Sequence, residues 1–180
     1  MATKAKTKAS CDAERKSSHS QTSSKRSQTE SVGINAFDLV EQDHRQIEEW
    51  LDEFDEMKEG DKRKGELAEK ICVALKVHSQ IEEEIFYPQA RDATKDDDLI
   101  DEAIVEHGTV KNLIGEIEKM KVDDELYDAK VRVLGEMVKR HIREEEEEIF
   151  SKLQSTKMEI DAVGKELAER KEALMEKMHA

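Results

Sequence analysis

Four stretches of this chain place apolar residues at steps of three and four, and each stretch carries one histidine within that spacing. Residues at these steps lie on one face of an α-helix, where they pack against other helices. The four apolar stripes are Phe37, Val40, His44, Ile47, Leu51 and Phe54; Leu67, Ile71, Ala74, His78, Ile81 and Ile85; Ile100, Ile104, His107, Val110, Ile114 and Ile117; and Val131, Leu134, Val138, His141, Glu145 and Ile149. The pattern predicts four helices that point their histidines inward.

Composition supports an all-α fold. Hydrophobic residues make up 36% of the chain and charged residues 41%, as expected of helices with a narrow core and solvated outer faces. One proline and seven glycines leave long stretches for helix. Because the predicted connections are short, neighbouring helices should be antiparallel, which predicts an up-down-up-down four-helix bundle.

Capping residues predict where these helices begin and end. The expected starts are Asn35 with Asp38, then Asp61, then Thr94 or Asp96, then Asp123 or Asp124. The first helix should end near Glu59-Gly60, since glycine suits the position after a helix. The second should end near Pro88, since proline cannot continue the hydrogen-bond ladder.

The chain divides into three parts. Residues 1–33 are rich in Ser, Thr and Lys and predict a disordered tail, residues 34–153 hold the bundle, and residues 154–180 form a helical extension. The stripe of a fifth helix at 157–178 runs Ile160, Val163 and Leu167, breaks at Arg170 and resumes at Leu174 and Met178. This helix is expected to pack either on the bundle or on a second copy of the chain, giving self-association.

Charge and cysteine content limit the partners and the compartment. The net charge is −14; the tail has seven Lys/Arg against three Asp/Glu, so it carries +4 and the remainder −18. Such a body should repel nucleic acid and anionic membranes, so neither is an expected partner. The two cysteines, Cys11 and Cys72, imply no disulfide framework. With no apolar run of membrane-spanning length and no signal sequence, the expected location is cytoplasmic.

Two similar strings carry the clearest chemistry. His78 stands four residues before Glu82, and His141 stands four residues before Glu145, 63 positions later. Positions i and i+4 of a helix face the same way, so each string directs an imidazole and a carboxylate at one point. Imidazole with carboxylate is a ligand set for iron, manganese or zinc.

The four histidines also share one level of the predicted bundle. His44 lies nine residues after Asn35 and His107 eleven after Asp96, while His78 and His141 each lie twelve before the expected helix ends at Ala90 and Leu153. At about 1.5 Å per residue, each is roughly 13–18 Å from the same end. Metal ligands must share a level, whereas hydrogen-bonded core histidines, the alternative, need not. Buried carboxylates without partners would also be costly. The candidate ligands are His44, His78, Glu82, His107, His141 and Glu145.

The chain resembles the hemerythrin-like, or HHE cation-binding, domain over roughly residues 35–153. The resemblance is carried by Asp43-His44; by His78-x3-Glu82-Glu83-x2-Phe86-Tyr87-Pro88; by Glu106-His107; and by His141-Ile142-x2-Glu145-Glu146-x2-Ile149-Phe150. It implies a non-haem di-iron centre with two iron ions. His44 and His78 would serve one iron, His107 and His141 the other, and Glu82 and Glu145 would bridge them.

Two departures separate the chain from oxygen-carrying hemerythrins. Those proteins have a histidine where Lys111 stands, and an aspartate five residues after the fourth-helix histidine, where this chain has a glutamate after four. The resemblance is therefore closer to the broader bacterial HHE group, with open metal positions for dioxygen, peroxide or nitric oxide. Three classes of function stay open: redox chemistry, binding for storage or sensing without turnover, and a partner-binding helical protein with structural metal.

The remaining side chains near the site have simpler interpretations. The other glutamates of the two strings, Glu83 and Glu84 and Glu146 to Glu148, are expected on a solvated face, and Tyr87 is expected to be a packing residue. A ferritin-like pattern of repeated Glu-x-x-His and the His-Glu-x-x-His zinc motif are both absent from the sequence.

Overall fold

The protein is described by a computed structural model that covers residues 35–58 and 60–179. The predicted tail, residues 1–33, and Cys11 lie outside the described residues. Every regular element of the described part is helical. No helix there is both long enough and apolar enough to cross a membrane.

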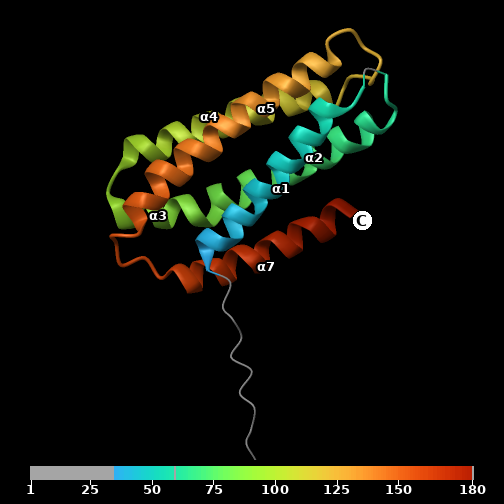
Figure 1. The fold of residues 1–180 in the computed structure, drawn as a ribbon. Coiled ribbons are helices and arrows are strands. Elements are labelled where there is room, and N and C mark those ends of the chain that lie inside the picture. Colours follow the sequence, from blue (N-terminus) through green and yellow to red (C-terminus); the bar gives the residue numbers. More distant parts are fainter. Residues whose placement is uncertain (1–34, 59, 180) are drawn as a thin grey trace, which may run out of the picture. The chain divides into compact units, whose positions relative to one another are not determined.

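Four long helices form the bundle (Figure 1). They are α1 (Ala36–Glu56), α2 (Arg63–Ile81), α4 (Asp97–Ile117) and α5 (Tyr127–Glu144). Helix α1 packs along α2, and α4 packs along α5; contacts of α1 with α5 and of α2 with α4 close the bundle. This arrangement confirms the predicted all-α four-helix fold.

Two of the predicted caps are present and a third start is wrong. The Asn35 side chain accepts a hydrogen bond from the Asp38 amide at 2.9 Å, and the Asp96 carboxylate accepts one from the Leu99 amide at 3.3 Å. The last bundle helix begins at Tyr127, not at Asp123 or Asp124. The Asp124 carboxylate accepts a hydrogen bond from the amide of Lys121, three residues earlier in the chain, at 2.9 Å. This bond stabilises a turn instead of the start of a helix.

The first two helices also differ from their expected ends. Helix α1 ends at Glu56 because Met57 is already extended, and Gly60 follows with a positive φ of 78°. Asp61 accepts from the Arg63 amide at 3.0 Å, although Lys62 occupies the capping position. The second helix does not end at Pro88. It continues through a π-helical turn, η1 (Glu82–Phe86), into α3 (Tyr87–Thr94).

Pro88 is tolerated because of where the π turn places it. Proline lacks an amide proton, which breaks the ladder inside an α-helix but has no effect in a first turn, where that amide has no intrahelical partner. The π turn restarts the helix at Tyr87, so Pro88 falls in the first turn of α3. A matching π turn, η2 (Glu145–Phe150), joins α5 to α6 (Ser151–Leu153).

The core consists of two apolar clusters, one on each side of the histidine level. One includes Val40, Ile81 and Ile149, and the other includes Ile47, Ile71 and Leu134. The predicted stripes line these clusters with one exception on α4. Ile104 is 38% exposed and Ala103 is buried in its place.

Helix α7 (Ile160–His179) packs against α1, α2 and η1, as Figure 1 shows for α1. Val163, Leu167 and Leu174 are buried in the first apolar cluster, whereas Met178 is exposed. Of the two expected roles for the fifth helix, packing on the bundle is therefore present in this structure. Self-association stays a prediction.

Candidate metal centre

Six ionisable side chains meet at the middle level of the bundle. They are the six candidate ligands: His44, His78, Glu82, His107, His141 and Glu145, all 5% exposed or less. His78 Nε2 lies 3.2 Å and His107 Nε2 lies 3.4 Å from the same Glu82 oxygen, Oε2. His107 Nε2 lies 3.0 Å from His141 Nε2. Ligand atoms bound at about 2.1 Å and at right angles on one metal are about 3 Å apart, so these separations suit coordination.

The six side chains fall into two groups of potential ligand atoms. The first holds His44, His78, Glu82 and Glu145, and the second holds Glu82, His107 and His141. The imidazole rings pair in the same way, with centroids 4.9 Å apart for His44 and His78 and 4.6 Å for His107 and His141. Glu82 belongs to both groups, the position of a bridging ligand. Glu145 belongs to the first group only, and its bridging role stays a prediction.

The π turns determine how the ends of α2 and α5 face the centre. Each begins at a candidate ligand, Glu82 in η1 and Glu145 in η2. In an α-helix the residues on one face are three or four apart, so Tyr87 would turn away from Glu82. The wider π turn brings it back, and the Tyr87 hydroxyl lies 3.5 Å from Glu82 Oε2. Single π turns often mark functional sites.

A ring of carboxylates surrounds the histidines and faces their Nδ1 atoms. His44 contacts Glu146 at 2.8 Å, His107 contacts Glu83 at 3.0 Å, and His141 contacts Glu106 at 2.8 Å. The fourth carboxylate, Asp43, is 3.9 Å from His78 Nδ1. Three of the four histidines are thus oriented by a hydrogen bond from a neighbouring helix, with Nε2 directed at the centre, as is common for metal-binding histidines, whereas Asp43 only approaches His78.

The prediction of a solvated face was wrong for Glu83 and Glu146. Glu83 contacts His107, and Glu146 contacts His44. Glu84, Glu147 and Glu148 are exposed, as expected. The 63-residue repeat could have revealed the two carboxylates. It relates Glu83 to Glu146 and Asp43 to Glu106, just as it relates the candidate ligands.

Each carboxylate of this ring also pairs with a cation. Arg45 pairs with Glu146, Lys111 with Glu83, Arg140 with Glu106, and Lys171 with Asp43. Three of these cations lie on bundle helices, and Lys171 lies on α7. Lys111, at the position where oxygen carriers have a histidine, is 41% exposed and reaches Glu83 instead of the centre. The extension therefore completes the charged ring around His78.

Burial and charge divide the protons of the metal-free centre unevenly. Burial lowers the pKa of His44, but the contacts to Glu145 and Glu146 outweigh it and raise the pKa to about 9. Burial lowers the pKa of His78 to about 4 and also lowers that of His107. Burial, with repulsion from Glu145, raises the pKa of Glu82 well above its ordinary value. Burial acts the same way on Glu145, but His44 reverses it and lowers that pKa to about 2.

Several buried atoms of the centre lack hydrogen-bond partners among the described residues. They are His44 Nε2, His78 Nδ1, Glu82 Oε1 and both carboxylate oxygens of Glu145. His44 Nε2 lies 3.2 Å from Glu145 Oε2, but in a poor direction for a hydrogen bond. Unpaired buried polar atoms are destabilising by about 1–3 kcal/mol each. A cation bound among them would satisfy these atoms, so the donor set fits a metal.

One aromatic pair breaks the near-twofold repetition of the centre. The Tyr87 hydroxyl lies 3.4 Å from His107 Nε2 and 3.5 Å from His141 Nε2. The 63-residue repeat relates Tyr87 to Phe150, whose ring stacks near His44 without a polar atom. Tyr87 is fully buried, so packing is part of its role, as expected. Its hydroxyl in addition places a polar group beside the shared Glu82 and the two histidines of the second group, His107 and His141.

Known proteins share this fold and sequence pattern. One relative is a protein described as a DNA nickase from Nostoc sp. (strain PCC 7120 / SAG 25.82 / UTEX 2576), 25% identical over 122 residues. The match covers 68% of this chain but about a third (34%) of that protein. A solved structure of a hemerythrin HHE cation binding domain-containing protein from Mycobacterium kansasii superposes with a TM-score of 0.67 at 22% identity. It covers 78% of this chain and 87% of the other.

The family comparison agrees with the geometry. Residues 35–153 match the hemerythrin HHE cation binding domain, a range that includes all six side chains of the centre and excludes α7. The paired histidines, the repeated carboxylates and the bundle all lie within this match. The chain belongs to the hemerythrin HHE cation-binding domain family.

Proposed function

We propose that this chain is a non-haem di-iron protein whose centre binds or reacts with dioxygen, peroxide or nitric oxide. The observation that carries the proposal is the sharing of Glu82 between two adjacent groups of buried histidines. A carboxylate shared in this way supports two metals rather than one. Mixed imidazole and carboxylate ligation suits iron, whereas structural zinc prefers a closed site of four ligands.

The residues of the chain have distinct tasks in this proposal. Iron bound at the centre would supply the redox chemistry toward small oxygen or nitrogen species. Three of the outer carboxylates, Glu146, Glu83 and Glu106, hold the imidazole rings of His44, His107 and His141 by their Nδ1 atoms, which keeps Nε2 free for metal. Burial raises the pKa of Tyr87 well above its ordinary value, so its hydroxyl keeps a proton next to His107 and His141 at neutral pH. The two apolar clusters exclude water on either side.

DNA nicking, the description of the Nostoc relative, is not the function that these residues support. That protein is about three times as long as the matched region, so its activity can depend on parts that this chain does not match. The body of this chain carries −18 by subtraction of the +4 tail from −14. A strongly acidic surface repels the phosphate backbone.

Optical spectroscopy and turnover test the proposal together. Iron-loaded protein should show near-ultraviolet bands of a bridged ferric pair, and peroxide or azide should change them. Steady-state consumption of hydrogen peroxide then separates redox chemistry from storage or sensing. Bands that form but respond to no small ligand would replace the redox proposal by a structural or sensing role.

A further inference from the structure

The two halves of the bundle differ most in what covers the centre. The 63-residue repeat relates α4 and η2 to α1 and η1, so each half should carry an equivalent groove beside its histidines. Helix α7 packs over the groove of the α1 and η1 half. Helix α7 packs along neither α4 nor η2, so it leaves the equivalent groove between them uncovered.

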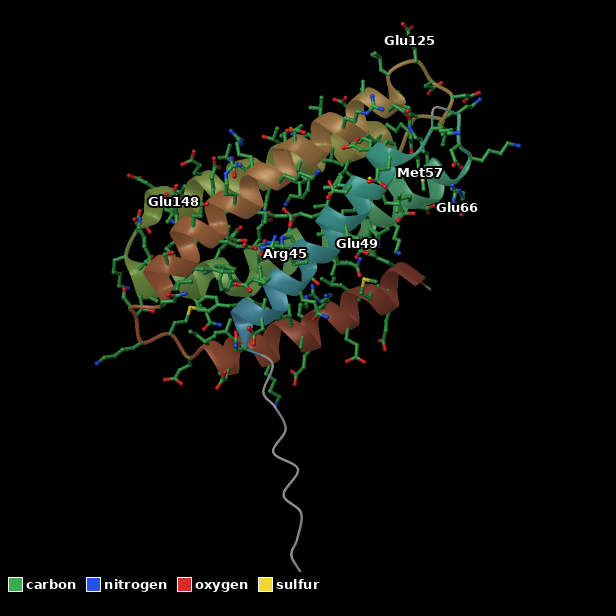
Figure 2. The ribbon with its side chains drawn as sticks, viewed as in Figure 1. Arg45, Glu49, Met57, Glu66, Glu125 and Glu148 are labelled. Carbon is green, nitrogen blue, oxygen red and sulfur yellow. The ribbon has the colours of Figure 1, made fainter. Side chains whose placement is uncertain are left out.

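The uncovered groove holds a cavity that reaches the centre. This cavity, of about 110 Å³, is lined by the candidate ligands His141 and Glu145, by four further glutamates, and by three apolar residues. The glutamates are Glu102, Glu106, Glu144 and Glu148, and the apolar residues are Leu99, Ala103 and Ile149. Glu102 and Glu148 are exposed, so the cavity extends from the surface to the buried ligands. Figure 2 shows Glu148 on the α4 and α5 side of the bundle, away from α7. Both oxygens of Glu145, at the inner end, have no hydrogen-bond partner.

The residues that line the groove of each half agree with whether α7 covers that groove. Glu102, Glu144 and Glu148 correspond, 63 positions earlier, to Leu39, Ile81 and Ile85. These three apolar residues pack in the same cluster as Val163 and Leu167 of α7. The same place in the fold is therefore apolar and sealed in one half, and acidic and open in the other.

A second cavity near the centre lacks these features. It has a volume of about 180 Å³, lies between α1, α2 and α7, and is lined by Asp43 and Lys171 but by none of the six candidate ligands. The Lys171 ammonium at its wall would repel a cation. Of the two cavities, only the α4–η2 cavity is therefore lined by candidate ligands together with carboxylates that reach the surface.

We propose that the α4–η2 cavity is a cation port, through which a divalent metal ion reaches the buried ligands from solution. Glu102 and Glu148 attract the ion at the mouth, Glu144 lines the passage, and Glu145 receives the ion at the inner end. A cleft lined by one sign of charge raises the local concentration of the opposite ion and its association rate. The port rests on the proposed metal centre, and its role is kinetic.

Cobalt uptake by the metal-free full-length chain tests the port. Cobalt(II) reports its own binding through visible absorption, so association rates can be followed by stopped flow without oxygen chemistry. The test variant is Glu102→Gln with Glu148→Gln, and the control is Glu53→Gln with Glu147→Gln. All four glutamates are exposed, and the control pair lies outside the cavity lining, so both variants lose the same charge.

The port variant should bind cobalt about three- to tenfold more slowly at low salt, with an unchanged final spectrum. The difference should disappear near 1 M salt, where the Debye length is about 3 Å. The control should stay close to the wild-type rate. Equal rates in all three proteins, or equal slowing in both variants, would overturn the port. A wild-type chain that takes up no cobalt would overturn the metal centre together with the port.

A blocking variant provides a check that does not depend on charge. Glu102→Trp places a large side chain at the mouth, and slow uptake that persists at high salt is the expected result. Circular dichroism and thermal melting confirm that the variant is folded. A folded Glu102→Trp protein that loads at the wild-type rate would show that metal enters elsewhere.

Discussion

Metal binding should be strongly linked to pH through His44. In the metal-free protein the pKa of His44 is about 9, because its contacts to Glu145 and Glu146 outweigh burial. At pH 7 the protonated form then exceeds the neutral form by about a hundredfold, and only neutral imidazole binds metal. Displacing this proton weakens metal binding at pH 7 by about 2.7 kcal/mol, two pH units at about 1.36 kcal/mol each.

Glu82 adds a second proton in the same direction, since its pKa is also raised in the metal-free centre. Affinity should therefore increase with pH between pH 6 and 8, by about tenfold per unit for His44 alone and by more where Glu82 also loses a proton. Calorimetry of zinc or cobalt binding in buffers of different ionisation enthalpy measures the proton release directly. One to two protons per chain are expected at pH 7.

Glu146→Gln is the variant that separates His44 from the other groups. It removes the charge at His44 Nδ1 but preserves the shape of the side chain, so the pKa of His44 should fall and the pH dependence should weaken. Glu147→Gln, one residue further along and exposed, should leave the wild-type slope. Metal affinity that is independent of pH between 6 and 8 would refute the reasoning, and so would equal slopes in all three proteins.

Three further results are expected. The metal-free protein should lose thermal stability as pH rises from about 7.5 to 9, because the raised pKa of His44 stabilises the fold below about 6.5 and this contribution disappears through about 9. The lowered pKa values of His78 and His107 act in the opposite direction, but only up to the range near 6.5 where their unfolded forms titrate. Melting curves of chelator-treated protein that rise between about pH 7.5 and 9 would contradict the prediction. Glu106→Gln should weaken metal binding by roughly ten- to hundredfold, and Asp43→Asn should weaken it by less. The reason is that Glu106 lies 2.8 Å from His141 Nδ1, whereas Asp43 lies 3.9 Å from His78 Nδ1. Chelator competition measures both affinities, and a larger loss in Asp43→Asn would be inconsistent with orientation by these carboxylates. Tyr87→Phe should change the free energy of unfolding by only about 1 kcal/mol, since the 63-residue repeat already places a phenylalanine, Phe150, at the equivalent position of the other half. The optical bands of the iron-loaded protein should shift in this variant. Unchanged bands would leave Tyr87 with a packing role only.

The fold and the convergence of the six side chains follow from periodicity in the sequence. The spacing of apolar residues predicts the helical faces at most positions. It is wrong at Ile104, which is exposed while its neighbour Ala103 is buried, and at Met178, which is exposed near the end of α7. Caps with a side-chain acceptor, Asn35 and Asp96, were predictable because the interaction is local. The start of α5 was not, because Asp124 can stabilise a turn or a helix and packing decides between them.

The outer ring of carboxylates could not be derived from helical faces alone. An ideal α-helix directs Glu83 and Glu146 away from the inward face, and the π turns alter that geometry. The predicted helix end at Pro88 is wrong for the same reason. Proline has no amide proton to donate inside an α-helix, but after a π turn that position needs no intrahelical donor. The position of α7 depends on tertiary packing, so its sequence alone could not decide between packing on the bundle and packing on a second copy of the chain.

The metal content of purified protein tests the central claim most directly. After loading with iron and exhaustive desalting, the wild-type chain should retain about two iron ions, since two adjacent groups of ligands share Glu82. Glu82→Ala should reduce this value sharply, whereas Glu147→Ala, on the exposed face, should leave it unchanged. A wild-type value of zero would contradict the metal centre, and a firm value of one would contradict its binuclear form.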